Sequence, residues 1–351
     1  MPKHFKPPGE DERLGAIGIR KKKHLSSTSA ASSEKVTRSK ARAATISSDD
    51  YILEHSRLYM HRRSQAEPSA DLLKALTPDP DLFLPMPKPH DMDWLAHHPE
   101  KGQTFEQFVA QPHNKPDAKR NVIHLLPLRF FEKSVPDDAL EALKEYASYF
   151  FLGMKVKILK GKYFAKKVVH RKNPDTGHKQ VNAEHILLHM LGLVQENSYC
   201  VAGITLCDLY PREEWNFVFG LASLSSRCGV YSLARYLPGF GEEEEEEGET
   251  EEESVASANL IRRACLLMCH EIGHMFGLRH CIYFKCIMNG SNHLMEFDRK
   301  LLFLCPVCLR KLHHSLAFDI VERYKNMLVF CEKYGITDEA EWLRRRISKL
   351  Q

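Results

Sequence analysis

The sequence lacks any apolar run long enough to cross a membrane. A transmembrane helix needs about eighteen consecutive apolar residues, and no run in the 351 residues approaches that length. The first residues also lack the apolar core of a secretory signal peptide. We therefore expect no membrane partner. We expect the ten cysteines to lie in a reducing intracellular compartment, cytoplasmic, nuclear or both, and not in a secreted protein.

A strong net charge is also lacking. The 50 Lys and Arg residues nearly balance the 46 Asp and Glu residues, and the net charge of +4 is too small to indicate a nucleic-acid partner. Charge is instead concentrated locally. Residues 1–50 are basic and poor in large apolar side chains, so they are predicted to be a disordered tail. Residues 241–254 contain ten glutamates, whose repulsion predicts a disordered acidic loop.

The rest of the chain predicts one α/β domain preceded by an extension. Residues 51–115 are expected to form short helices and proline-rich loops, and residues 116–351 the main domain. Alternating hydrophobic patterns predict strands over residues 121–128, 154–159 and 199–206 and helices over residues 136–152 and 183–193, followed by helices at the C-terminus. This order is typical of a mostly parallel sheet.

Two further strand-like pieces follow, at residues 217–222 and 230–236. One of them is expected to be an exposed edge strand, because an extended peptide can bind a sheet by pairing with its edge. We expect that strand to be residues 230–235. The alternative is that these residues form an ordinary interior strand.

The run from His270 to His280 is the most informative part of the sequence. Residues four apart lie on one face of a helix, so His270 and His274 can hold one metal ion. Glu271 lies beside the first histidine, where it can take a proton from a metal-bound water. Gly277 can end the helix and let His280 arrive as a third ligand. Three protein ligands leave one position open, as in catalytic zinc sites.

The helix pattern favours a metal site over the alternative, a histidine-rich helix without a metal. Apolar side chains recur every three or four residues and form one stripe, away from His270 and His274. The members of the stripe are Ile261, Cys265, Met268, Ile272 and Phe276.

A second metal site is predicted from cysteine spacing. Cys281 and Cys286 form one pair, and Cys305 and Cys308 form a Cys-x-x-Cys. Four thiolates fill a tetrahedron, so this site would hold a structural zinc. The alternatives are two disulfides or four free thiols. Because His280 and Cys281 are adjacent, the structural zinc would fix the loop that carries the third catalytic ligand.

The histidine motif followed by Met288 resembles that of the metzincin metalloproteases, whose Met-turn lies beneath the catalytic zinc. The cysteines around Met288 resemble one subgroup, the archaemetzincins, with the motif H-E-x-x-H-x-x-G-x-x-H-C, then C-x-M and a later C-x-x-C. Every element of that motif is present. Segments 208–211, 215–220 and 291–294 are also similar, and the resemblance spans roughly residues 80–330.

The resemblance implies a zinc-dependent peptidase. It implies a metzincin-like catalytic domain with an edge strand at the cleft, one catalytic and one structural zinc per chain, and a peptide or protein substrate. In the expected mechanism Glu271 is the general base for a zinc-bound water. Aminopeptidase-like and endopeptidase action both remain open, and we expect a monomer. The alternative function is a non-catalytic zinc scaffold that binds a partner through its four cysteines.

Overall fold

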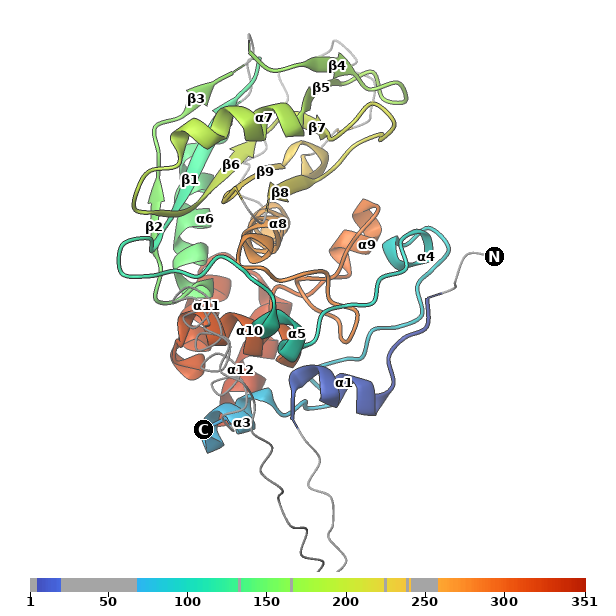
Figure 1. Ribbon diagram of the computed structural model, residues 1–351, viewed down its shortest axis with the longest axis vertical. Coiled ribbons are helices and arrows are strands. Elements are labelled where there is room, and N and C mark those ends of the chain that lie inside the picture. Colours follow the sequence, from blue (N-terminus) through green and yellow to red (C-terminus); the bar gives the residue numbers. More distant parts are fainter. Residues whose placement is uncertain are drawn as a thin grey trace, which may run out of the picture.

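The computed structural model describes residues 5–19, 68–131, 134–164, 167–223, 226–237, 240 and 258–351. In these residues a mixed sheet with helices on both faces lies above a cluster of helices (Figure 1). Residues 20–50 of the predicted tail and the acidic loop at residues 241–254 lie outside the described part of the chain.

The main sheet is mixed and mostly parallel, as predicted. Its strands follow the order β2-β1-β6-β9-β8, and β3 also pairs with β1. Only β8 and β9 pair in the antiparallel sense. The strands are β1 (Val122–Arg129), β2 (Lys155–Ile158), β3 (Lys162–Tyr163), β6 (Ser198–Thr205), β8 (Gly220–Ser223) and β9 (Cys228–Ser232).

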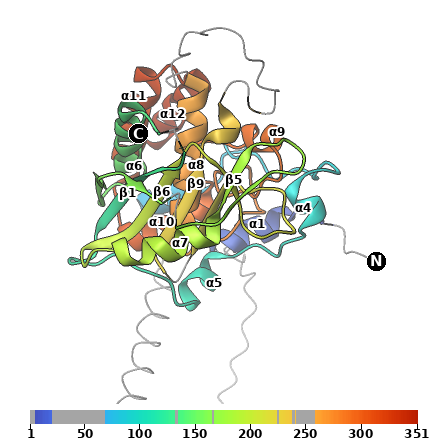
Figure 2. The same cartoon turned by 90° about the horizontal axis from the view of Figure 1, so that it is seen from above.

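Helices cover both faces of this sheet. On one face lie α6 (Asp137–Phe150) and α8 (Ala258–Met275), and on the other α7 (Ala183–Met190), as Figure 2 shows. Side chains alternate along a strand, so β1 supplies both cores. Ile123 packs in the core with α6 and α8, and Leu128 packs in the core with α7.

A smaller sheet was not predicted. It has the order β4-β5-β7, with β4 and β5 antiparallel and β5 and β7 parallel. Its short strands carry mixed polar residues, which gave no clear period-two pattern. The strands are β4 (His170–Lys172), β5 (Lys179–Asn182) and β7 (Asp208–Tyr210).

The remaining helices come from both ends of the chain. The C-terminal helices are α9 (Leu294–Asp298), α10 (Pro306–Leu316), α11 (Ile320–Lys333) and α12 (Thr337–Leu350). The N-terminal ones are α1 (Glu10–Ile17), α3 (Ala70–Leu76), α4 (Trp94–His97) and α5 (Phe105–Ala110). Three of these, α1, α3 and α5, pack against α10. None of the described helices has the length and apolar character of a membrane span.

The prediction that residues 1–50 are disordered is wrong for α1. Ala16 and Ile17 are buried, and Gly18 ends the helix with φ of +78°. The Arg310 guanidinium donates a hydrogen bond to the Ile17 carbonyl. The composition of the whole tail hid this helix, because its few apolar residues are diluted by polar neighbours.

The prediction that residues 230–235 form the edge strand is also wrong. Residues 230–232 belong to β9, which is hydrogen-bonded to β6 on one side and to β8 on the other, and residues 234 and 235 begin the 3-10 helix η2 (Ala234–Tyr236). The edge strand is β8, which is half-buried while β9 is fully buried. The two strands form a hairpin, and their apolar patterns do not indicate which one docks on β6.

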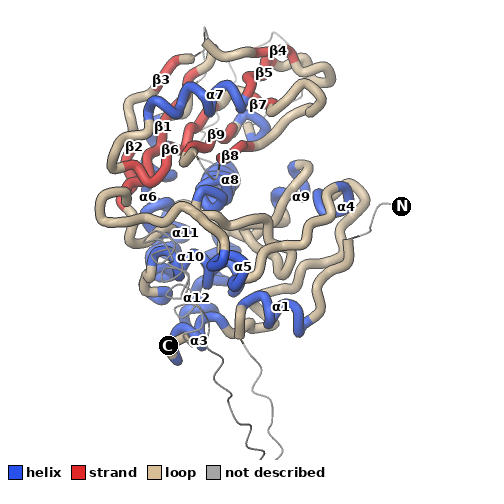
Figure 3. Tube along the Cα trace, viewed as in Figure 1, coloured by secondary structure: helices blue, strands red, loops and turns tan. Residues whose placement is uncertain are grey.

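A long, mostly irregular segment connects α3 to α5. Residues 80–104, which we call the strap, leave the helical cluster, form α4 beside α9 and return (Figure 3). The strap first runs along the loop that carries Cys281 and Cys286. The Lys285 N–H donates to the Leu84 carbonyl, and the Met86 N–H donates to the Tyr283 carbonyl. Residues nearly two hundred positions apart in sequence therefore lie side by side.

Candidate active site

Three imidazoles meet at the C-terminal end of α8. His270 and His274 lie one turn apart on the helix, and their Nε2 atoms are 3.1 Å apart. Gly277, with φ of +85°, lets the chain reverse after the helix. The ring of His280 then lies 5.3 Å from that of His270 and 5.0 Å from that of His274, centroid to centroid. The structure thus brings together the three histidines of the motif, with one nitrogen of each within 4.8 Å of the others.

Each imidazole is oriented through its Nδ1 atom. The Nδ1 atoms of His270 and His274 are 2.8 and 2.7 Å from backbone carbonyl oxygens. The Nδ1 atom of His280 is 2.8 Å from Oε1 of Glu100. These acceptors place a proton on Nδ1 and leave Nε2 of each ring to face the shared centre.

This donor set fits a zinc ion. Burial lowers the pKa of His270 well below its usual range and that of His274 to about 3, so both rings are neutral ligands at pH 7. Two nitrogen ligands of a tetrahedral zinc lie about 3.4 Å apart, close to the 3.1 Å between the two Nε2 atoms on α8. The three histidines would hold the ion and leave a fourth position open.

Glu271 is buried beside the ligands and touches the edge strand. Its side chain is almost inaccessible, and burial raises its pKa to about 8, against a smaller lowering by Lys300. A Cβ atom built on Gly220, the first residue of β8, would lie 2.5 Å from Oε1 of Glu271. The carboxyl group of Glu271, the residue that follows His270 on α8, therefore lies against the start of β8.

Met288 packs beneath the histidine pair. A Cβ atom built on Gly273 would lie 2.6 Å from Sδ of Met288, so the methionine fits only because this helical position is glycine. Met288 is buried, and its carbonyl accepts a hydrogen bond from the Cys281 N–H at 2.8 Å. The methionine thus forms an apolar floor under the helix and holds the start of the cysteine loop.

The four predicted cysteine ligands also form one cluster. One sulfur of each lies within 4.8 Å of the others, and Sγ of Cys281 is 3.6 Å from Sγ of Cys305. All four are buried free thiols. Two sulfurs on a tetrahedral zinc lie about 3.8 Å apart, so the cluster fits a zinc ion and not a disulfide pair. Cys305 and Cys308 flank the start of α10.

The other cysteines are buried thiols outside both described clusters, as the sequence predicted. They are Cys200, Cys207, Cys228, Cys265, Cys269 and Cys331.

The strap supplies site residues that sequence reasoning missed. Besides the contact of Glu100 with His280, the side chain of Gln103 donates from Nε2 to the Gly277 carbonyl at 3.1 Å and accepts from the Arg279 N–H at 3.3 Å. Gln103 is buried. These residues have no motif spacing, and Glu100 is 180 positions from its partner, so no sequence signal connected them to the site.

A polar cluster clamps the strap to α9. Asp93, His293 and Glu296 lie close enough to resemble a metal site. Their acceptors already have donors, because Asp93 pairs with the Arg299 guanidinium and Glu296 accepts the Trp94 N–H at 3.0 Å. His293 caps α9, and its Nε2 atom lies 3.2 Å from Oδ1 of Asp93.

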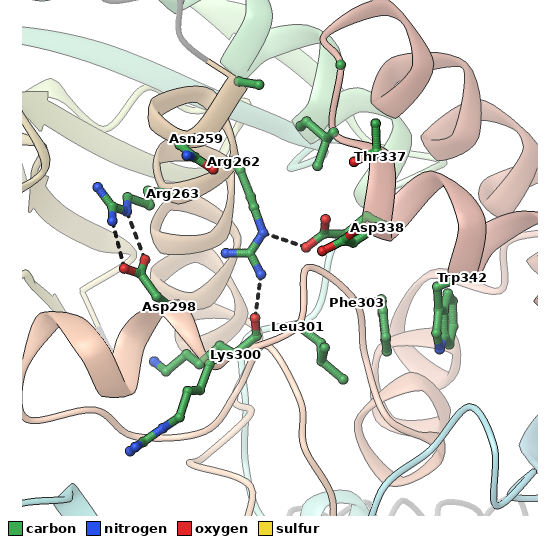
Figure 4. Close-up of a pocket in the computed structure, with 15 residues that line it drawn as sticks. Asn259, Arg262, Arg263, Asp298, Lys300, Leu301, Phe303, Thr337, Asp338 and Trp342 are labelled. Carbon is green, nitrogen blue, oxygen red and sulfur yellow. Dashed lines mark hydrogen bonds and ion pairs between the residues drawn. The ribbon is translucent and has the colours of Figure 1, made fainter.

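A separate pocket of about 540 Å³ lies at the other end of α8. Figure 4 shows two of its arginines engaged: Arg263 pairs with Asp298, and Arg262 pairs with Glu339 of α12 and donates to the Lys300 carbonyl. None of the predicted metal ligands lines this pocket. The pocket lies between α8 and α12 and is not part of the imidazole site.

The chain is similar to several known proteins. A solved archaemetzincin structure from Methanopyrus kandleri is 27% identical, covers 58% of this chain and 99% of that chain, and has a TM-score of 0.42. Peptidase family M54 matches residues 201–314. Archaemetzincin-2 from Rattus norvegicus is 39% identical over 76% of this chain and 81% of that protein. Archaemetzincin-2 from Homo sapiens is 36% identical over 73% and 76%, respectively. The chain therefore belongs to the archaemetzincin family of zinc metallopeptidases.

Proposed function

We propose that this protein hydrolyses peptide bonds at a single catalytic zinc held by His270, His274 and His280, with Glu271 as the general base. One observation carries the proposal. One nitrogen of each of the three imidazoles converges on a shared centre, while the buried carboxyl group of Glu271, next to His270 on α8, lies against an edge strand. A purely structural zinc site has no use for a carboxylate at that position, which argues against the alternative of a non-catalytic scaffold.

When bound, zinc would act as a Lewis acid that makes water a nucleophile near neutral pH and polarises the scissile carbonyl. Glu271 takes the proton of the attacking water and passes it to the leaving amine. Its raised pKa, about 8, suits a group that must both accept and release a proton near pH 7. Met288 takes no part in proton transfer and keeps the base of the site apolar.

The substrate is proposed to bind as an extended strand along β8. This strand pairs with β9 on one side and forms one end of the main sheet. Its first residue, Gly220, lies against Glu271. A peptide that pairs with β8 would therefore place its backbone beside the base.

A second zinc is proposed at Cys281, Cys286, Cys305 and Cys308, where it would be structural because four thiolates leave no open position. We also propose that the enzyme works as an intracellular monomer, in the cytoplasm, the nucleus or both. The ten free thiols support a reducing compartment.

A peptide-library digest with the full chain tests the function. We expect cleavage by the wild type, loss of cleavage after dialysis against a chelator, and recovery when zinc is restored. The variant Glu271→Ala should keep its zinc and lose about 10²- to 10⁴-fold in rate. If the zinc-loaded wild type cleaves no peptide in the library, the proposed activity is wrong.

A further inference from the structure

The third imidazole is oriented differently from the other two. His270 and His274 lie on one helix and direct Nδ1 at backbone carbonyl oxygens. His280 lies beyond the helix in a loop, its side chain is 21% exposed, and its Nδ1 partner is the side chain of Glu100. The rigid helix fixes the first two rings, whereas the third depends on a carboxylate from a distant segment.

Glu100 is itself held in place. The indole Nε1 of Trp94 donates to Oε1 of Glu100 at 2.6 Å, and the indole ring packs edge-on against His280 with centroids 5.3 Å apart. The ring of Trp94 also fills the space over Gly290, where a Cβ atom would lie 2.4 Å from it. The same carboxylate oxygen thus accepts from both an indole and the imidazole, which fixes its direction.

The strap also holds the backbone on which His280 lies. Gln103 bonds the Gly277 carbonyl and the Arg279 N–H, so both ends of the short turn before His280 are fixed by one side chain. The Lys311 ammonium group donates to the carbonyl of Gln103 and to its side chain. The position of the loop and the direction of its ring are therefore both set by residues 100–103.

We propose that Glu100 is a positioning residue for the catalytic zinc: it fixes the tautomer and the direction of His280, so the strap completes a metal site whose ligands all lie elsewhere. A carboxylate on the far nitrogen of a ligating imidazole makes the ring a stronger ligand. Removal of such a partner lowers metal affinity or activity by about 10- to 100-fold. The inference rests on the proposed zinc site at the three histidines.

The test measures metal binding directly. The full chain is loaded with Co²⁺ and titrated with a chelator while the visible spectrum is followed, because thiolate and imidazole sites absorb differently. Zinc affinity is measured by competition in the same way. Glu100→Ala should weaken the histidine site about 10- to 100-fold and leave the cysteine site unchanged, and Glu100→Gln should fall between it and the wild type.

Glu106→Gln is the matched control, because Glu106 is an exposed glutamate on α5, just beyond the strap. It should bind both metals as the wild type does. Glu100→Gln keeps the shape of the side chain, so it decides the question if Glu100→Ala does not fold. Wild-type affinity and an unchanged cobalt spectrum in both Glu100 variants would overturn the proposal. Wild-type chain that binds zinc without cleaving peptides would instead contradict the proposed activity alone.

Trp94 gives an independent check. Trp94→Phe removes the indole donor but keeps an aromatic ring, and it should lower metal affinity at the histidine site by a smaller factor. If Trp94 acts through Glu100, the same change made in Glu100→Ala should have no further effect on that affinity. Additive losses in the double variant would show that the two residues act separately and would overturn this arrangement.

Discussion

Gly220 and Glu271 touch across the space between the edge strand and the active-site helix. A Cβ atom on Gly220 would lie 2.5 Å from Oε1 of Glu271 and 2.9 Å from its Cγ. No side chain can occupy this position without moving the carboxyl group. The contact fixes the distance between the proposed base and the strand proposed to bind the substrate.

The first prediction follows from this contact. Gly220→Ala should displace Glu271 and lower kcat/KM by about 10²-fold or more, while zinc content stays at the wild-type value. Gly192→Ala is the control, because a Cβ atom there meets nothing within 4 Å. A wild-type value of kcat/KM in Gly220→Ala would contradict this prediction.

The second prediction concerns the floor of the site. Alanine at a helical glycine usually adds about 1 kcal/mol of stability. At Gly273 it should destabilise instead, because the new Cβ would lie 2.6 Å from Sδ of Met288. Thermal unfolding of the zinc-loaded protein measures the effect. Shortening the methionine with Met288→Val should relieve the clash, so the double variant should be more stable than the sum of the two single changes predicts. Simple additivity would argue against the contact.

The third prediction concerns His280 and Cys281, adjacent residues proposed to bind different zinc ions. Cys305→Ser should empty the cysteine site and also loosen the loop that carries His280, so zinc per chain should fall below one after gel filtration. Cys207→Ser is a suitable control, since its thiol donates to the Lys179 carbonyl and a hydroxyl can replace it. Full retention of zinc at the histidine site in Cys305→Ser would contradict the coupling.

The fourth prediction concerns pH and the clamp on the strap. Burial would raise the pKa of Asp93, but hydrogen bonds from the His90 N–H and Arg299 outweigh it and lower the pKa. A lowered folded pKa contributes stability above the ordinary value, near pH 4, and loses it as pH falls through the folded value. The free energy of unfolding of Asp93→Asn at pH 7 should therefore be about 1–2 kcal/mol lower than that of the wild type. Thermal unfolding of both proteins across the pH range measures the difference. This difference should shrink below about pH 4, and a constant difference from pH 7 to pH 3 would contradict the assignment.

Local features of the site could be predicted from the sequence because local geometry determines them. The helical repeat places His270 and His274 on one face, and glycine at position 277 permits the left-handed turn that leads to His280. The grouping of the cysteines follows equally from two short loops. These predictions needed only short-range spacing, and the structure brings the same residues together.

Features set by tertiary packing could not be predicted. Hydrophobic patterns found both strands of the β8–β9 hairpin but not which one docks on β6. Glu100 carries no pattern at all, because a half-buried glutamate after a proline looks like any loop residue. Contacts such as those of Glu100 with His280 and of Gln103 with the loop depend on how the strap crosses the finished domain.

The strap is synthesised long before its partners at the site. Residues 80–104 leave the ribosome before every residue that they contact at the metal site. At about 5–20 residues per second, the ribosome adds the stretch from the strap to α9 in roughly 10–40 s. Throughout that interval Glu100 and Gln103 have no partners at the site. The nascent chain therefore cannot finish its hydrolytic centre until translation is nearly complete, which delays proteolytic capacity until the surrounding domain has formed.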